Sequence, residues 1–196
     1  MDDLDRAVIT ACRRQEQGAF RRLIDRHGQP VYALCVALAG ADGEDLAQET
    51  FLRVFRAIGD FDAGGPASLR GWILTIARRL CTDRARHVRR GIELPIPPPD
   101  AADPGAGPDE RLAARRLGEQ LAVALAALPE EQRAVVALRE WEGLEYDEIA
   151  AIEGVPVGTV RSRLARARAA LRETLAPAGG EVTDPRRSSR VAPVQG

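Results

Sequence analysis

Residues 146–162 read Tyr146-Asp147-Glu148-Ile149-Ala150-Ala151-Ile152-Glu153-Gly154-Val155-Pro156-Val157-Gly158-Thr159-Val160-Arg161-Ser162. This stretch predicts a short helix that ends at Ile152, a tight turn, and a second helix from Pro156 to about Leu175. Gly154 is well placed for a left-handed residue in the turn, and Pro156 suits the first turn of a helix. The spacing is typical of a helix-turn-helix, although an ordinary helical corner would share it.

The second helix of this motif has two chemically different faces. Its apolar positions recur three or four residues apart: Val160, Leu164, Ala167 and Leu171. The opposite face carries small, hydroxyl and basic residues: Gly158, Arg161, Ser162, Ala165 and Arg172. Such a face could enter a DNA major groove, where arginine pairs with guanine and serine with several base edges. Further arginines lie on the flanks, where they would suit phosphates: Arg163, Arg166 and Arg168.

The sequence on both sides of the motif is also helical in pattern. Apolar residues recur three or four apart between residues 19 and 80 and again between residues 117 and 141, and no strand-like alternation appears. Aromatic residues make up only 4% of the chain, so the core is expected to consist of Leu, Val, Ile and Ala. The sequence therefore predicts an all-α fold.

Two segments without helical periodicity divide the chain. Residues 91–110 hold nine Pro or Gly and five acids, which predicts a flexible acidic linker with neither helix nor strand. Its extended reach would be roughly 65 Å. Residues 176–196 are expected to form a disordered tail. The prediction is thus two small helical domains, at residues 10–90 and 111–175, with the helix-turn-helix in the second.

Composition excludes several classes of protein. Three cysteines without CxxC spacing and only two histidines argue against a zinc site, a disulfide scaffold or a histidine-based triad. No phosphate-binding loop is present either, so we expect no enzymatic activity, metal or cofactor. The chain has no apolar run of about 18 residues and begins with acidic residues, so neither a membrane span nor a signal peptide is expected. These features suit a protein of the reducing cytoplasm.

Charge is segregated along the chain, although 28 arginines and 29 acids sum to only −1. Residues 70–90 carry a formal +6 and residues 155–175 carry +4, whereas residues 42–62 carry −4 and residues 119–153 carry −7. A single basic helix would ordinarily be a solvated face. Two basic helices, one in each helical block, favour a DNA ligand.

The second block resembles the domain of bacterial RNA polymerase sigma factors of the extracytoplasmic-function (ECF) group that reads the promoter −35 element. The resemblance rests on Leu128-Pro129, on Tyr146–Ala150, on Gly154–Leu164 and on Arg166–Arg168. The first block independently resembles the −10 domain of the same group, through Glu44–Phe55, Gly71–Arg78 and Asp83–Arg86. Both matches follow the order of that family, with a linker between them, and together they cover most of the chain.

The resemblance implies binding roles for three sets of residues. The set for −35 DNA is Gly158, Thr159, Arg161, Ser162, Arg163, Ala165, Arg166 and Arg168. The set for the melted −10 strand is Phe61, Asp62, Ser68, Arg70, Arg78, Arg79, Arg84 and Arg86. The set for the clamp helices of the largest polymerase subunit shares one helical face: Asp45, Gln48, Glu49 and Leu52.

Some positions leave these roles open. The Phe61 ring could stack on a base or pack inward, and the apolar pattern favours packing. Trp72 shares a stripe with Ile73 and Ile76, which favours the core. Arg79 stands where the family commonly has Asn, which favours a phosphate contact over a base contact at this position.

The resemblance implies a sigma factor that confers promoter choice on core RNA polymerase and contacts its clamp helices and the flap of its second largest subunit. An anti-sigma factor is a further implied partner. The alternative is a helix-turn-helix regulator that does not replace the housekeeping sigma factor. The acidic helix at Glu44–Phe55 and the two-domain order favour the first reading. A further alternative is a sigma-like protein that binds an anti-sigma protein but not DNA. The intact basic face of the second block disfavours it.

Overall fold

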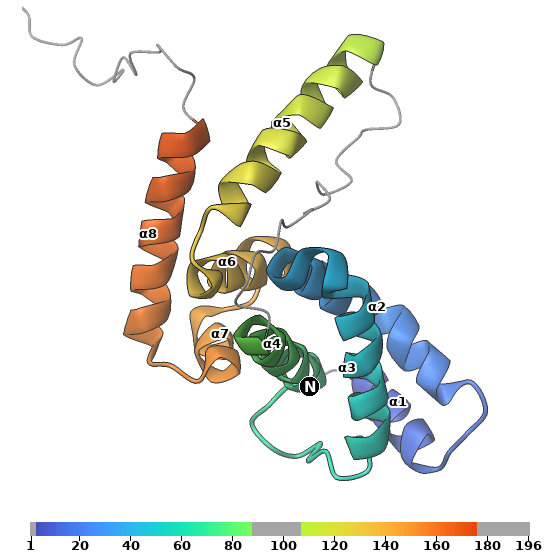
Figure 1. Cartoon of the computed structure of the whole chain (residues 1–196). Coiled ribbons are helices and arrows are strands. Elements are labelled where there is room, and N and C mark those ends of the chain that lie inside the picture. The colour runs from blue at the N-terminus through green and yellow to red at the C-terminus, as the bar shows by residue number, and fades with distance from the viewer. Residues whose placement is uncertain (1–2, 88–106, 176–196) are drawn as a thin grey trace, which may run out of the picture.

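The structure is a computed structural model that describes residues 3–87 and 107–175 (Figure 1). Every regular element in these two ranges is helical, which confirms the predicted all-α fold. No helix among the described residues is long and apolar enough to cross a membrane.

The first half of the molecule is a bundle built around a long central helix. Its elements are α1 (Asp3–Arg13), α2 (Ala19–Ala39), the short 3-10 turn η1 (Gly40–Asp42), α3 (Gly43–Ala57) and α4 (Leu69–His87). Helix α2 packs on both α3 and α4. Aliphatic side chains fill the space between them, with Leu23, Leu34 and Val54 wholly inaccessible to solvent. Each such burial contributes about 1.5–3 kcal/mol relative to exposure.

Helix α1 begins before the range predicted for the first domain. Val8 and Ile9 are buried against α2, and Asp5 is buried with them. The Arg26 side chain donates a hydrogen bond from Nε to Asp5 Oδ1 at 2.8 Å, which satisfies that carboxylate. The acidic residues Asp3 and Asp5 are therefore part of a helix of the folded bundle.

The second half contains the predicted helix-turn-helix. Its elements are α5 (Pro108–Ala126), α6 (Glu130–Val136), a π-helical segment η2 (Ala137–Trp141), α7 (Tyr146–Glu153) and α8 (Val157–Leu175). The start of α5 corrects the predicted linker, because residues 108–110 are helical. Proline is tolerated at a first helical position, where its missing N–H would have no partner. The rest of the predicted linker, except Gly107, and the predicted tail lie outside the described residues.

The two halves pack against each other. Helix α4 contacts α7, and α2 contacts both α6 and η2. Figure 1 shows α4 lying against α7, while α5 and α8 diverge on the far side of α6. One continuous apolar core joins the halves, and it includes Leu80 of α4 and Ile152 of α7. The basic helix of the first half is thus brought against the acidic part of the second.

Candidate nucleic-acid and polymerase interfaces

The turn between α7 and α8 has the geometry expected of a helix-turn-helix. A capping box fixes the start of α7: the Glu145 backbone N–H donates to Glu148 Oε2 at 2.9 Å. Gly154 ends the helix in the left-handed region (φ 66°, ψ 34°), and its N–H donates to the Ala150 carbonyl. A side chain would be strained there, which explains glycine at this position. Helix α8 then begins at Val157, directly after Pro156.

Helix α8 presents the predicted groove face to solvent. Val160, Leu164 and Ala167 are buried beneath it. Of the eight residues predicted for −35 DNA, five are exposed: Gly158, Arg161, Ala165, Arg166 and Arg168. Thr159 and Ser162 are half-buried, and the Ser162 hydroxyl donates to the Thr159 carbonyl at 2.9 Å. The exposed side chains form one continuous side of the helix, as a groove contact requires.

Two flanking arginines of α8 are paired with acids. Arg163 Nη1 lies 3.3 Å from Glu153 Oε2, and Arg168 Nη2 lies 2.6 Å from Glu140 Oε1. The hydrogen bond to Glu140 raises the pKa of Arg168. Both side chains of that second pair are about half exposed, so it contributes little to stability and can exchange for a phosphate.

Arginines of α4 divide into an outward and an inward set. Arg79 is exposed, and Arg84 and Arg86 form accessible pairs with Asp42 and Asp83 at 2.9 and 3.7 Å. These three side chains stay available to a DNA backbone, because such surface pairs are weak.

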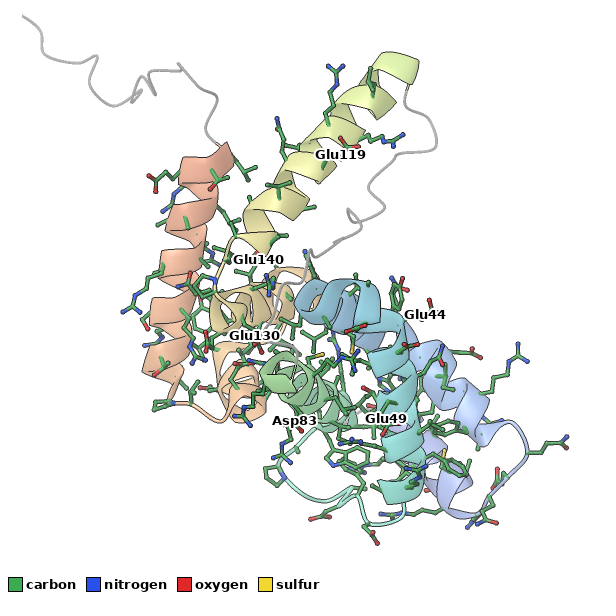
Figure 2. All side chains as sticks on the ribbon, viewed as in Figure 1. Glu44, Glu49, Asp83, Glu119, Glu130 and Glu140 are labelled. Carbon is green, nitrogen blue, oxygen red and sulfur yellow. The ribbon has the colours of Figure 1, made fainter. Side chains whose placement is uncertain are left out.

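The inward set, Arg70 and Arg78, contacts the second half of the molecule. Arg70 Nη2 donates to the Glu142 carbonyl at 2.8 Å and also pairs with the Glu142 carboxylate. Arg78 Nε donates to Glu153 Oε1 at 2.7 Å, and its Nη1 donates to Glu130 Oε1 at 2.6 Å. Figure 2 shows Glu130 at the junction of α6 and α4.

Arg78 is 7% exposed, so its charge is taken out of water. Burial by itself lowers the pKa of a guanidinium, but the Glu153 and Glu130 carboxylates outweigh burial and raise the pKa of Arg78. The side chain is therefore a fixed cation held between two acids. Arg78 is predicted to bind the −10 strand, but in this structure Glu130 and Glu153 of the second half of the molecule cover it.

The loop before α4 is held by its own side chains. Phe61 is 5% exposed and its ring centroid lies 4.9 Å from that of Trp72, so the inward packing favoured for Phe61 is confirmed, as is a packed Trp72. Ser68 Oγ accepts a hydrogen bond from the Gly71 N–H at 3.0 Å, at the start of α4. Asp62 is exposed, and its Oδ1 accepts from the Gly64 N–H at 2.9 Å. Of the three predicted −10 residues in this loop, Asp62 alone is exposed.

Helix α3 carries the surface predicted to bind polymerase. Asp45 and Gln48 are exposed, Leu52 is 50% exposed, and Glu49 is half-buried with a 2.9 Å bond from Arg53 Nε. These four side chains lie on one side of α3, and Figure 2 shows Glu49 there.

An apolar patch beside this surface was not predicted. Phe55 is 59% exposed, and Ile24 of α2 is 38% exposed. Phe20, also on α2, packs against Phe55, with ring centroids 4.9 Å apart. Large exposed apolar groups that lie together mark contact surfaces. The sequence indicates the exposure of Phe55, because this residue lies beside the apolar stripe of its helix that packs into the core, not on that stripe.

The described residues offer no metal site. All three cysteines are free thiols, and within residues 3–87 and 107–175 no cluster of three or more His, Cys, Asp or Glu could hold an ion.

These features define a class: an all-helical protein that pairs a helix-turn-helix, whose second helix exposes a basic face, with a second basic helical bundle. Comparison with known families agrees. Residues 23–91 match the model of Sigma-70 region 2, and residues 118–171 match the model of Sigma-70, region 4. The chain belongs to the ECF group of RNA polymerase sigma factors. Below, region 2 denotes α1–α4 and region 4 denotes α5–α8.

Curated relatives and solved structures cover nearly the whole chain. It is 31% identical to the ECF RNA polymerase sigma-E factor of Salmonella typhimurium over 88% of this chain and 95% of that protein. It is 42% identical to the ECF RNA polymerase sigma factor SigE of Mycolicibacterium smegmatis over 83% of its length, and spans 64% of that relative. Among solved structures, the sigma factor RpoE in complex with the anti-sigma factor NepR from Bartonella quintana shows 25% identity and a TM-score of 0.60, covering 81% of this chain and 97% of that one.

Proposed function

We propose that the protein binds core RNA polymerase and directs promoter-specific transcription initiation, by reading the −35 duplex with region 4 and capturing the melted −10 strand with region 2. The observation that carries this proposal is the exposed groove face of α8 on a chain that also contains region 2. The protein itself would perform no catalysis and would act in the cytoplasm, where polymerase and promoter meet.

Recognition of −35 DNA is assigned to the outer side of α8. Arg161 is exposed at the centre of this side and offers bidentate donors for guanine O6 and N7. Gly158 has open space around it and admits the DNA backbone closely. The charged flanks, Arg163, Arg166 and Arg168, would hold phosphates, whereas Ala165 offers a methyl group. Thr159 and Ser162 supply hydroxyl groups near the start of the helix.

Capture of −10 DNA is assigned to the loop before α4 and to α4 itself. Arg79, Arg84 and Arg86 are accessible and would follow the single-strand backbone. Arg70 and Arg78 would join them once region 4 moves away. Asp62 and Ser68 line the loop that would receive an unstacked base, and Phe61 would support that loop from below through its contact with Trp72.

Binding to polymerase is assigned to α3. Asp45, Gln48 and Glu49 supply acceptors for basic residues of the clamp helices, and Leu52 adds an exposed apolar group. The neighbouring Phe55 extends this surface. Region 4 would contact the flap of the second largest subunit.

An anti-sigma factor is a further proposed partner. The solved RpoE relative was determined together with the anti-sigma factor NepR, and this chain aligns with 97% of it. An anti-sigma factor would compete with polymerase or DNA for the exposed surfaces of regions 2 and 4.

Run-off transcription tests the proposal. Purified core polymerase, free of any other sigma factor, is mixed with the protein and a library of genomic promoter fragments, and transcripts are sequenced. We expect transcripts that share a −35 and a −10 element and that vanish without the protein. A conventional regulator would bind DNA in the same assay but start no transcript until a housekeeping sigma factor is added.

A further inference from the structure

The loop before α4 (residues 59–68) is contacted by α1, a helix that carries none of the predicted binding residues. Arg13, in the last turn of α1, donates a hydrogen bond from Nη2 to the Phe61 carbonyl, 48 residues further along the chain. We propose that Arg13 is a positioning residue, through which α1 holds this loop in the form that receives the unstacked −10 base. The inference rests on the proposed function in one respect, the assignment of the loop to that base.

The composition of the loop explains why it needs an external contact. Residues 59–68 form neither helix nor strand, and three of these ten residues are glycine. Glycine loses more conformational freedom than any other residue when its backbone is fixed. A loop of this kind keeps one conformation only where other parts of the molecule hold it.

Bonds within the loop shape its tip but do not place the tip on the protein. The Gly64 N–H donates to Asp62 Oδ1 at 2.9 Å, and the Gly65 N–H donates to the Asp62 carbonyl at 3.2 Å. Both bonds are local. The position of the tip is set by the preceding residue, Phe61, whose buried ring packs on Trp72 of α4 and whose carbonyl accepts from Arg13 of α1. Asp62, the exposed residue of the predicted set, therefore follows a residue that is fixed by two helices.

Arg13 itself lies on a fixed backbone, as a positioning residue must. Helix α1 ends in a Schellman motif: the Glu16 N–H donates to the Ala11 carbonyl and the Gln15 N–H donates to the Cys12 carbonyl, both at 3.0 Å. Gln15 takes the left-handed conformation that this motif requires, with φ 54°. The end of α1 is thus closed by its own backbone directly after Arg13.

A direct contact with DNA is the competing role for Arg13. Its side chain is exposed, so the remaining N–H groups of the guanidinium could pair with a phosphate. The two roles have different consequences. A phosphate contact contributes equally to all sequences and adds to the salt dependence of binding. A positioning role contributes to the choice of base, because only the correctly held loop can recognise it.

Three variants of the full-length chain separate these roles. R13M removes the donor and the charge but keeps an unbranched stem of similar length. R13K restores a charged donor, which can still make a single bond to a carbonyl. The matched control is R14M, the same change at the neighbouring exposed arginine, which pairs with Glu16 at 4.0 Å. Circular dichroism verifies helicity for each protein.

Each protein is assembled with core polymerase and mixed with a pool of short single-stranded DNA whose centre is randomised. Sequencing of the bound strands measures base preference, with core polymerase alone as background. Fluorescence anisotropy at two salt concentrations measures the affinity averaged over the pool. Hydrogen–deuterium exchange of the free proteins follows the amides of residues 59–68.

For R13M we expect the preference for the best-bound base to fall roughly 10-fold, as follows if the loop keeps the receiving form in only about a tenth of the molecules. Amide exchange in the loop should be faster than in wild type. The affinity averaged over the pool should match that of R14M within about twofold, because contacts with phosphates remain. R13K should regain most of the preference, and R14M should keep all of it.

Two results would overturn the inference alone. One is an R13M variant with the base preference of wild type. The other is an affinity that falls equally for all sequences with a weaker salt dependence, which would assign Arg13 to a phosphate. A wild-type holoenzyme that shows no base preference would instead refute the assignment of the loop to the −10 base, and this inference with it.

Discussion

Phe20 and Phe55 meet edge to face, with ring centroids 4.9 Å apart, although they lie on different helices and Phe55 remains 59% exposed. An aromatic pair at the surface is fixed in position without being buried. The pair lies beside the acidic side of α3. One surface of the protein therefore offers both an apolar and a charged contact to a partner. A coiled coil with basic and apolar side chains would complement both.

Substitution of the exposed apolar residues should weaken polymerase binding without unfolding region 2. For L52A/F55A we expect core affinity to fall at least about 10-fold, because apolar contacts at the centre of an interface often contribute above 1 kcal/mol each. The melting temperature should change little, since both side chains are at least half exposed. The control is Y32A, which truncates a 40% exposed side chain of α2. Equal affinities for L52A/F55A and Y32A would exclude this surface.

The acidic part of the same helix should matter in a salt-dependent way. D45A/Q48A is expected to weaken core binding while helicity is retained, because both side chains are exposed on the surface of α3. Titration of labelled protein with core polymerase at 50 and 300 mM salt measures this, and the loss should be larger at low salt. An affinity equal to wild type at both salt concentrations would count against a clamp contact.

Arg161 should contribute to sequence choice rather than to overall affinity. R161A is expected to cost about 1–3 kcal/mol at one −35 base and to relax specificity there. R166A, on the flank of the same helix, should weaken all sequences alike because phosphates carry no sequence information. Binding of a −35 library by both variants, followed by sequencing, separates the two effects. A uniform loss for R161A would refute its contact with a base.

Gly43 should tolerate no side chain. A Cβ at this position would lie 2.5 Å from Val36 Cα, which is backbone and cannot rotate away. G43A is therefore expected to destabilise region 2 by about 1–3 kcal/mol, as overpacking does. G59A is the matched control, because a Cβ there meets nothing within 4 Å. Urea unfolding of both variants gives the comparison, and equal stabilities would show that α3 can shift away from α2.

His27 should make folding stability depend on pH. Burial lowers the pKa of His27 below 6.5 despite the opposing charge of Asp5, whose Oδ1 lies 3.3 Å from Nε2. The unfolded chain then binds the proton more readily, so the free energy of unfolding falls as pH drops below about 6.5, by at most about 1.4 kcal/mol per pH unit. The H27Q variant should lack this contribution to the pH dependence of the free energy of unfolding.

Urea unfolding of wild type and H27Q at pH 7.5 and 5.5 checks that expectation. The stability difference between the two proteins should be smaller at the lower pH. A difference that stays constant would mean that His27 takes up its proton equally in both states.

Local chemistry explains which parts of the fold could be predicted from the sequence. Gly154 and Pro156 define a turn by their own backbone preferences, so the helix-turn-helix was predictable. Helix α1 was not, because its apolar stripe is short, with Val8 and Ile9 buried, and Arg26, the partner of its buried Asp5, lies on another helix. The start of α5 was misjudged because proline ends helices and also begins them.

The binding surfaces were predictable only in outline. Periodicity separates the outer side of α8 from its buried side, and the structure agrees for Arg161 and Val160. It cannot show that Arg78 meets acids 52 and 75 residues further along the chain. Long-range ion pairs carry no periodic signal, and for this reason Arg78 was assigned to DNA without its intramolecular partners.

The packing of Trp72 on Phe61 has a practical consequence for solution studies. The chain has two tryptophans, and the other, Trp141, ends η2 in region 4. Each region thus contains its own intrinsic fluorophore. Replacing one indole by phenylalanine would leave emission from a single region, so movement of the loop before α4 during promoter melting could be followed in real time without any attached dye.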